Sequence, residues 1–110
     1  MAPKLDAKVI VLLDGRAVSA AETVLQIIHD NHMGILVGEP SAGTNGNVSI
    51  TPLPAGFSIR FTGMRVQLVD GTALQGRGIT PDQVVHPTLA GAQAGRDEIL
   101  EAALQLASRI

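Results

Sequence analysis

The spacing of hydrophobic residues changes its period along the chain. The apolar run in KVIVLL, residues 8–13, predicts a fully buried strand that stops at Asp14-Gly15. A helical period follows over about residues 19–31, and GILVGE at residues 34–39 predicts a second buried strand. Because strand, helix and strand follow one another closely, we expect a βαβ unit with two parallel strands.

The predicted helix over residues 19–31 carries a start signal and an apolar face. Ser19 and Glu22 have the S-x-x-E spacing of a capping box, in which both side chains bind backbone N–H groups at the helix start. The face predicted to be buried consists of Ala20, Val24, Ile27, Ile28 and Asn31.

From residue 47 onward the period is two. Residues 47–53 and 57–61 alternate around Pro54-Ala55-Gly56, which predicts a hairpin, and residues 64–69 predict a further strand. The glycine- and proline-rich residues 76–87 predict an extended, ordered loop. A last helix is predicted from Asp97, its N-cap, to about Ser108. Its predicted buried face is Ile99, Leu100, Ala103, Leu104 and Ala107.

Composition limits the functional classes. The 110 residues amount to one domain at most, and 45% are apolar, which is enough for a packed core. With two aromatic residues, scattered basic residues and a net charge of -2, we expect no nucleic-acid partner. The longest apolar run, residues 9–13, is too short to span a membrane. The absence of cysteine from the sequence rules out disulfides and thiolate metal sites.

Ser19 is the leading candidate for chemistry, and two interpretations of it stay open. Serine is a preferred N-cap, and with Glu22 completing the box this role needs no chemistry. The same turn from strand to helix would also expose the hydroxyl beside the free N–H groups of the helix start, which can stabilise an oxyanion. The turn lacks the G-x-S-x-G pattern of the α/β-hydrolases.

The other candidates favour structural roles. Gly38 and Gly43 have the spacing of a phosphate-binding loop, but Thr44 stands where lysine is required, and no helix follows. A zinc site needs three or four ligands, and the sequence offers no such group, so we expect no metal and no cofactor. Structural roles are therefore expected for the histidines, His29, His32 and His86.

The order of these segments resembles the catalytic core of the C-terminal-processing (tail-specific) serine peptidases, and in particular their tricorn-like branch. After the apolar strand, the matching blocks are AVSAAE, GILVGEPSAGT, VDGTALQGRGITPD and GRDEILEAAL. The resemblance extends over about residues 8–104. It implies an α/β domain of the crotonase-like type, with a βαβ core, an antiparallel hairpin and a C-terminal helix.

The resemblance also implies roles for single residues. Ser19 stands at the position of the family's nucleophile, and the N–H of Ala20 at that of an oxyanion donor. Gln75 stands where the tricorn-like branch has an acidic orienting residue, and it could orient by hydrogen bonding without charge. One branch has a lysine base at the position of Thr44, and a threonine hydroxyl is too weakly basic for that role.

In the tricorn-like branch the histidine base lies upstream of the nucleophile strand. The second oxyanion donor and the PDZ-like domain also lie upstream. We therefore expect residues 1–110 to be the C-terminal part of a peptidase core, inactive or nearly so alone. The implied activity is serine endopeptidase action on extended or C-terminal polypeptide segments. The resemblance favours a periplasmic or secreted location, and a cytoplasmic one stays open.

Two other functions remain open, and one expectation concerns assembly. The chain could be a non-catalytic ligand- or peptide-binding domain of the same fold, or a structural piece in which Ser19 only caps its helix. Because the strand at residues 8–13 would lose a neighbour in a shortened core, we expect a homo-oligomer or assembly through an exposed strand edge.

Overall fold

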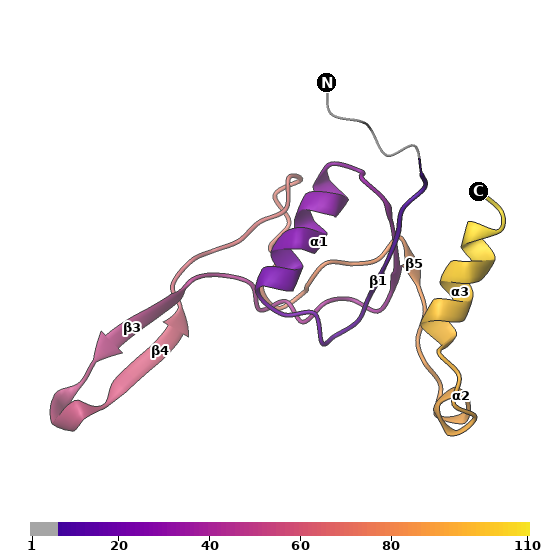
Figure 1. The fold of residues 1–110 in the computed structure, drawn as a ribbon. Coiled ribbons are helices and arrows are strands. Elements are labelled where there is room, and N and C mark those ends of the chain that lie inside the picture. Colours follow the sequence, from indigo (N-terminus) through magenta and orange to yellow (C-terminus); the bar gives the residue numbers. More distant parts are fainter. Residues whose placement is uncertain (1–6) are drawn as a thin grey trace.

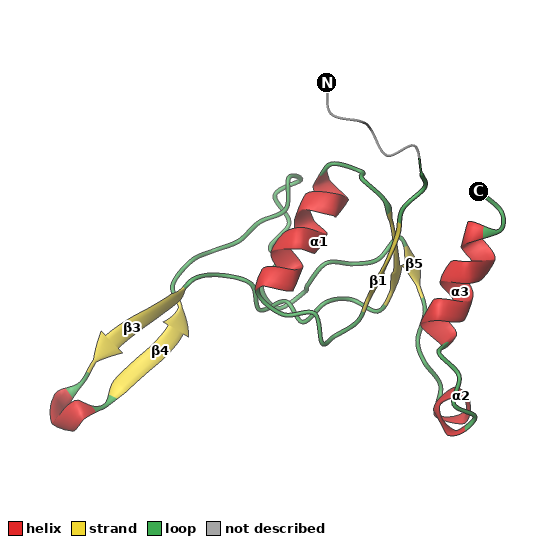
Figure 2. Cartoon of the chain, in the orientation of Figure 1, coloured by secondary structure: helices red, strands yellow, loops and turns green. Residues whose placement is uncertain are grey.

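A computed structural model describes residues 7–110, which form a parallel sheet flanked by helices and a separate hairpin (Figures 1 and 2). Strand β1, Ile10–Leu13, pairs in parallel with β2, Ile35–Gly38, and helix α1, Ala20–Asp30, connects them. The predicted βαβ unit is therefore confirmed. A third parallel strand, β5, Gln83–Val84, gives the order β1-β2-β5 among residues 7–110, in which β1 is the outer strand and is not fully buried.

Two parts of the second half differ from the sequence prediction. Residues 64–69 do not form a strand, because the Val66 N–H donates to the side chain of Gln75 at 3.0 Å and the Asp70-Gly71 turn bends the chain. Only an isolated bridge between Gln67 and Ala73 forms there. Conversely, β5 lies inside the loop predicted at residues 76–87, since two residues are too few to show a strand period.

The two faces of the sheet carry separate core clusters. Neighbouring residues of a strand point to opposite faces, and Leu36 and Val37 of β2 are both fully buried. Leu36 packs in one cluster with Leu25 of α1, and Val37 packs in the other with Ile99 of α3, Glu98–Ala107. The sheet is thus covered by α1 on one face and α3 on the other (Figure 1), which gives a mixed α/β architecture.

Helix α1 buries a different face from the one predicted. Glu22 and Leu25 are buried, whereas Val24 and Ile27 are 56% and 51% exposed. The cause is Glu22, whose carboxylate is hydrogen-bonded beneath the helix and turns this side inward. Of the predicted face, Ile28 is partly buried, and the others are exposed, namely Ala20, Val24, Ile27 and Asn31.

Helix α3 confirms the predicted start and part of the predicted face. The Asp97 side chain accepts a hydrogen bond from the Leu100 N–H at 2.9 Å, as an N-cap does. Ile99 and Ala103 are buried against the sheet. The narrow sheet covers only one stripe of the helix. Three residues expected on the buried face are therefore exposed: Leu100, Leu104 and Ala107. A short helix before it, α2, Leu89–Gln93, was not predicted.

The predicted hairpin forms and projects from the body (Figures 1 and 2). Strand β3, Val48–Pro52, pairs antiparallel with β4, Ser58–Thr62, around the 3-10 turn Pro54–Gly56. The hairpin makes the molecule elongated, with extents of 59 × 48 × 25 Å. The radius of gyration is 17.6 Å, whereas a compact chain of this length has about 13 Å. Across residues 7–110, no helix is long and apolar enough to cross a membrane.

Candidate active site

Ser19 occupies a strained backbone conformation at the turn between β1 and α1. Its φ of 51° and ψ of -114° lie in a region that side-chain-bearing residues rarely adopt, at a cost of about 1–3 kcal/mol. Ser19 and Glu22 have the arrangement of the predicted capping box, and one half of it is a hydrogen bond, in which the Ser19 N–H donates to Glu22 Oε2 at 3.2 Å. The Ser19 hydroxyl itself makes no cap hydrogen bond, and the residue is exposed. The hydrogen bond that holds the serine therefore comes from its backbone N–H and not from its hydroxyl.

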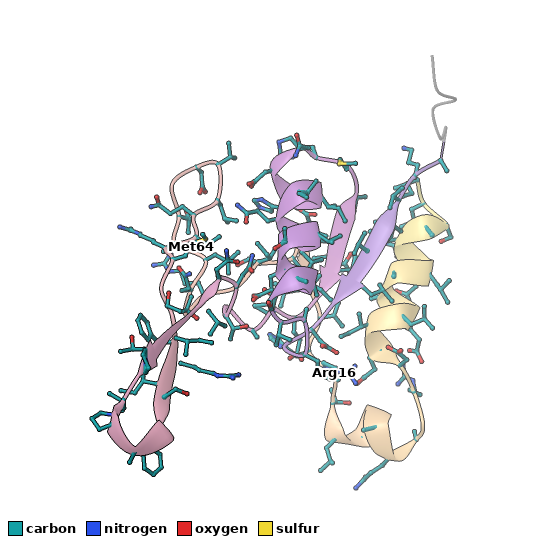
Figure 3. All side chains as sticks on the ribbon, turned by 60° about the vertical axis from the view of Figure 1, so that its left-hand side comes forward. Arg16 and Met64 are labelled. Carbon is teal, nitrogen blue, oxygen red and sulfur yellow. The ribbon has the colours of Figure 1, made fainter. Side chains whose placement is uncertain are left out.

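The residues before Ser19 fix the turn independently of its hydroxyl. The Asp14 carboxylate accepts from the Arg16 N–H at 2.8 Å and from the Arg16 Nε at 2.9 Å. The hydrogen bonds from Arg16 lower the pKa of Asp14, so this carboxylate is ionised. Ala17 is tied to the following loop, because its carbonyl accepts from the Ala42 N–H at 3.0 Å. Arg16 is labelled in Figure 3, where it lies below the start of α1.

Ala20 is the first residue of α1 and lies directly after the strained serine. The first N–H groups of a helix have no acceptor within the helix. Within residues 7–110 the Ala20 N–H makes no hydrogen bond, whereas the next one, from Ala21, reaches the Val18 carbonyl at 3.1 Å. A free N–H at the positive end of a helix, beside an exposed hydroxyl, can stabilise negative charge on an oxygen.

Glu22 connects this turn with the loop after β2. Its side chain is completely buried. Oε1 accepts from the Ser41 hydroxyl at 2.7 Å and from the Gly43 N–H at 2.6 Å, and Oε2 accepts from the Thr44 N–H at 2.9 Å. The Ser19 N–H donates to the same Oε2, so one carboxylate oxygen joins Ser19 and Thr44. The sequence predicted only a capping role for Glu22. The one local signal for its burial was its spacing of three residues from Leu25.

The charge on Glu22 follows from two opposing effects. Burial favours the neutral carboxyl group and raises its pKa. The hydrogen bonds from Ser41, Thr44 and Gly43 favour the carboxylate, and together they bring the pKa of Glu22 below its ordinary value. A buried, ionised carboxylate with only donors around it is a rigid element of the site.

Close backbone packing holds the loop around Glu22 in place. A Cβ atom on Gly43, whose φ is 70°, would lie 2.7 Å from the Gly78 backbone nitrogen. A Cβ on Gly78, whose φ is 75°, would collide with the Ser41 carbonyl oxygen. Ser41 also accepts a hydrogen bond from the Ile79 N–H at 2.7 Å through its hydroxyl. These glycines therefore serve loop-to-loop packing, and the loop leads to the hairpin instead of a helix.

Gln75 lies at the root of the hairpin, and all its side-chain hydrogen bonds go to backbone groups. Its Nε2 donates to the carbonyl oxygens of Asn45 at 2.8 Å and Met64 at 2.7 Å, and its Oε1 accepts from the Val66 N–H. Met64 is labelled in Figure 3 beside this root. Gln75 makes no hydrogen bond with Ser19, so an orienting effect on the serine would pass through residues 44–46.

The histidines lie apart from Ser19 in their contacts. His29 Nδ1 is 2.9 Å from Asp30 Oδ1, and His86 Nδ1 is 2.8 Å from Glu39 Oε1. The part of the chain that the structure describes contains no group of three or more metal-ligating side chains.

Comparisons with known sequences show the family of the chain. The sequence model of peptidase family S41 matches residues 2–85. A carboxy-terminal-processing protease of Bartonella bacilliformis is 35% identical over 92 residues, which are 84% of this chain and 21% of the relative. The chloroplastic carboxyl-terminal-processing peptidase 1 of Arabidopsis thaliana is 32% identical over 80 residues, which are 73% of this chain and 16% of that protein. The chain thus spans about a fifth of these relatives.

Solved structures share the fold over most of the chain. A Parabacteroides merdae protein assigned as a peptidase has a TM-score of 0.83 and 29% identity, over 94% of this chain and 32% of its own. The tricorn protease has a TM-score of 0.78 over 90% of this chain and 10% of its own; at 18% identity this is a likeness of fold alone. The family match and the curated relatives confirm the resemblance to the C-terminal-processing peptidases, and the chain belongs to peptidase family S41.

Proposed function

We propose that Ser19 is the nucleophile of a serine endopeptidase whose catalytic core includes this chain. The observation that carries the proposal is the strained backbone of Ser19, an exposed residue whose hydroxyl makes no cap hydrogen bond. A serine kept only to cap a helix would use its hydroxyl and an unstrained backbone. Strain at such a residue is typical of a catalytic turn. We assign the domain to the crotonase-like α/β fold.

In the proposed reaction, Ser19 Oγ bonds to the carbonyl carbon of a peptide and its proton passes to a general base. The Ala20 N–H stabilises the resulting oxyanion, and the amine then leaves with the proton. Water cleaves the acyl-serine ester and restores the hydroxyl. Within residues 7–110 no histidine or lysine hydrogen-bonds to Ser19, so we assign the base to sequence outside this range or to a partner subunit.

Gln75 is proposed as a positioning residue that acts through the hairpin root. Its amide holds the Asn45 carbonyl, and Thr44 next to it donates to the carboxylate oxygen that also receives the Ser19 N–H. The proposed substrates are extended or C-terminal segments of polypeptides, as the names of the curated relatives indicate for those proteins. The exposed hairpin is a candidate surface for adding such a segment as a strand.

Labelling with a fluorophosphonate probe tests the proposal. The 110-residue chain and a longer chain that carries the family's upstream segments are each labelled, digested and mapped by peptide mass, with Ser19→Ala of both as controls. We expect an adduct on Ser19 in the longer chain alone, and cleavage of an unstructured peptide by that chain only. Absence of an adduct from the folded longer chain would favour a non-catalytic ligand- or peptide-binding domain, in which Ser19 belongs to the helix start.

A further inference from the structure

Glu22 is the only buried acidic residue among residues 7–110. A buried carboxylate is costly unless donors surround it, and here donors meet both of its oxygens. Ser41 and Gly43 donate to Oε1, while Oε2 accepts from the Ser19 N–H and from both the N–H and the hydroxyl of Thr44. A glutamate that only completes a capping box needs the single bond to the N-cap N–H. The remaining bonds of Glu22 therefore need another explanation.

These bonds lie where the backbone is strained. A residue at the φ of Ser19 keeps this conformation only where its surroundings hold it there. The Ser19 carbonyl is held by the helix, because it accepts from the Thr23 N–H at 3.2 Å, and the Ala17 carbonyl is held by the Ala42 N–H. The Ser19 N–H itself is held by Glu22. Glu22 thus ties the strained residue directly to the loop at residues 41–44.

We propose that Glu22 is a positioning residue for the nucleophile, and that its carboxylate holds the backbone of Ser19 at its positive φ. The N–H of Ala20 belongs to the peptide unit that follows Ser19, so the backbone angles of Ser19 set its direction. Glu22 would in this way fix the Ser19 side chain and the Ala20 N–H relative to each other. The catalytic part of this inference rests on the proposed function of Ser19.

A double-mutant cycle in the 110-residue chain tests the hold without measuring activity. Ser19→Gly alone should stabilise the fold, because glycine adopts a positive φ freely. Glu22→Ala removes both acceptor oxygens and lets Ser19 relax, so Ser19→Gly should give no gain in that background. Glu101→Ala is the matched control, since it removes an exposed acid bonded to Arg96 on α3 and should leave the full gain. Equal gains in all backgrounds would overturn the proposal.

Nuclear magnetic resonance of the wild-type chain tests the same hold if Glu22→Ala fails to fold. A strong nuclear Overhauser effect between the amide and α protons of Ser19 is expected from its positive φ. On acidification, the amide protons of Ser19 and Thr44 should shift together with the Glu22 carboxyl carbon, since both donate to Oε2. The hydrogen-bond partners of Glu22 carry no titratable side chain. A Ser19 amide that does not follow Glu22 would contradict the proposal.

The rate of fluorophosphonate labelling at Ser19 tests the catalytic part, in the longer chain that carries the upstream segments. Because a displacement of about 1 Å can cost roughly 100-fold in rate, we expect Glu22→Ala to label about 100-fold more slowly. Glu22→Gln, which keeps one acceptor oxygen, should lie between Glu22→Ala and wild type, and Glu101→Ala should match wild type. With a peptide substrate, kcat should fall while KM stays nearly constant. Far-UV circular dichroism verifies that each variant is folded.

The outcomes separate this inference from the proposed function. Equal labelling of wild type and folded Glu22→Ala would refute the positioning role and leave Ser19 as the nucleophile. Absence of label from the wild-type longer chain would refute the nucleophile and the catalytic part of this inference together. The double-mutant cycle then decides whether Glu22 holds the strained turn.

Discussion

Strain and hydrogen bonding at Ser19 predict an unusual response to substitution. Ser19→Ala removes a hydroxyl that makes no cap hydrogen bond, so the free energy of unfolding should change by less than about 0.5 kcal/mol. Ser19→Gly should raise it by about 1 kcal/mol, because glycine adopts a positive φ freely. Asp97→Ala is the matched control, since it removes a hydrogen-bonded cap and should cost about 1 kcal/mol. Urea unfolding measures all three variants. If Ser19→Ala lowered the free energy of unfolding as much as Asp97→Ala, Ser19 would act as a helix cap.

Glu22 predicts a specific dependence of stability on pH. Its pKa in the folded chain lies below its ordinary value, so its contribution is present above the unfolded pKa of about 4.3 and is lost as the pH falls through the folded pKa. Glu22→Gln should cost about 2–4 kcal/mol near neutral pH, because an amide cannot accept from all these donors.

Urea unfolding of wild type and Glu22→Gln from neutral to acidic pH measures this contribution. The difference in the free energy of unfolding should narrow as the pH falls. Glu39→Gln, which changes an acid in an exposed contact with His86, should show no comparable loss. A constant difference between wild type and Glu22→Gln over the whole range would show that the charge of Glu22 does not stabilise the fold.

At the scale of elements, the Gln75 amide joins the ends of the hairpin to the body. Gln75→Glu should destabilise this junction by about 2–4 kcal/mol, because a carboxylate cannot donate to the carbonyls of Asn45 and Met64 and would be repelled by both. Amide hydrogen exchange should accelerate in β3 and β4 and stay unchanged in β2.

Gln75→Ala provides a comparison without the added charge. It should accelerate the same amides to a smaller extent. Unchanged exchange in the hairpin of both variants would mean that the Gln75 amide does not hold its root.

The elements show what can be predicted from one sequence. Short apolar runs identified β1 and β2, and local periods identified α1, the hairpin and α3, because both kinds of pattern lie within a single element. The face that each helix buries depends on partners far along the chain. Glu22 turns α1 toward residues 41–44, and no local pattern contains that loop. For the same reason β5 was missed, since its bonds come from the distant β2.

Some features of the candidate site could likewise be predicted from the sequence, and others could not. A serine at a strand-to-helix turn, three residues before an acid, was visible as a pattern, and the order of segments indicated the family. The strained φ of Ser19 was not visible in the sequence. The hydrogen bonds of Glu22 were not visible either, because they come from residues 41–44, which lie far along the chain. Gln75 was noticed by its position in the sequence, while its contacts at the hairpin root depend on the fold.

At the scale of the whole molecule, the hairpin and the body are structurally separate. The core clusters include residues from before and after the hairpin, such as Leu36 and Leu74, whereas almost every residue of β3 and β4 is exposed. A local opening of the hairpin should therefore cost less free energy than an opening of the body.

Limited proteolysis with chymotrypsin tests this separation, because the two aromatic residues of the chain, Phe57 and Phe61, both lie in the hairpin. Phe57 is 70% exposed and Phe61 is 50% exposed, so the first cut should follow Phe57, roughly tenfold or more ahead of any cut in the body. Phe57→Ala should move this cut to Phe61. The two fragments should stay associated, because Leu36 lies in one and Leu74 in the other within the same core cluster. Fragments that separate on gel filtration, or a first cut within α1 or α3, would mean that hairpin and body unfold together.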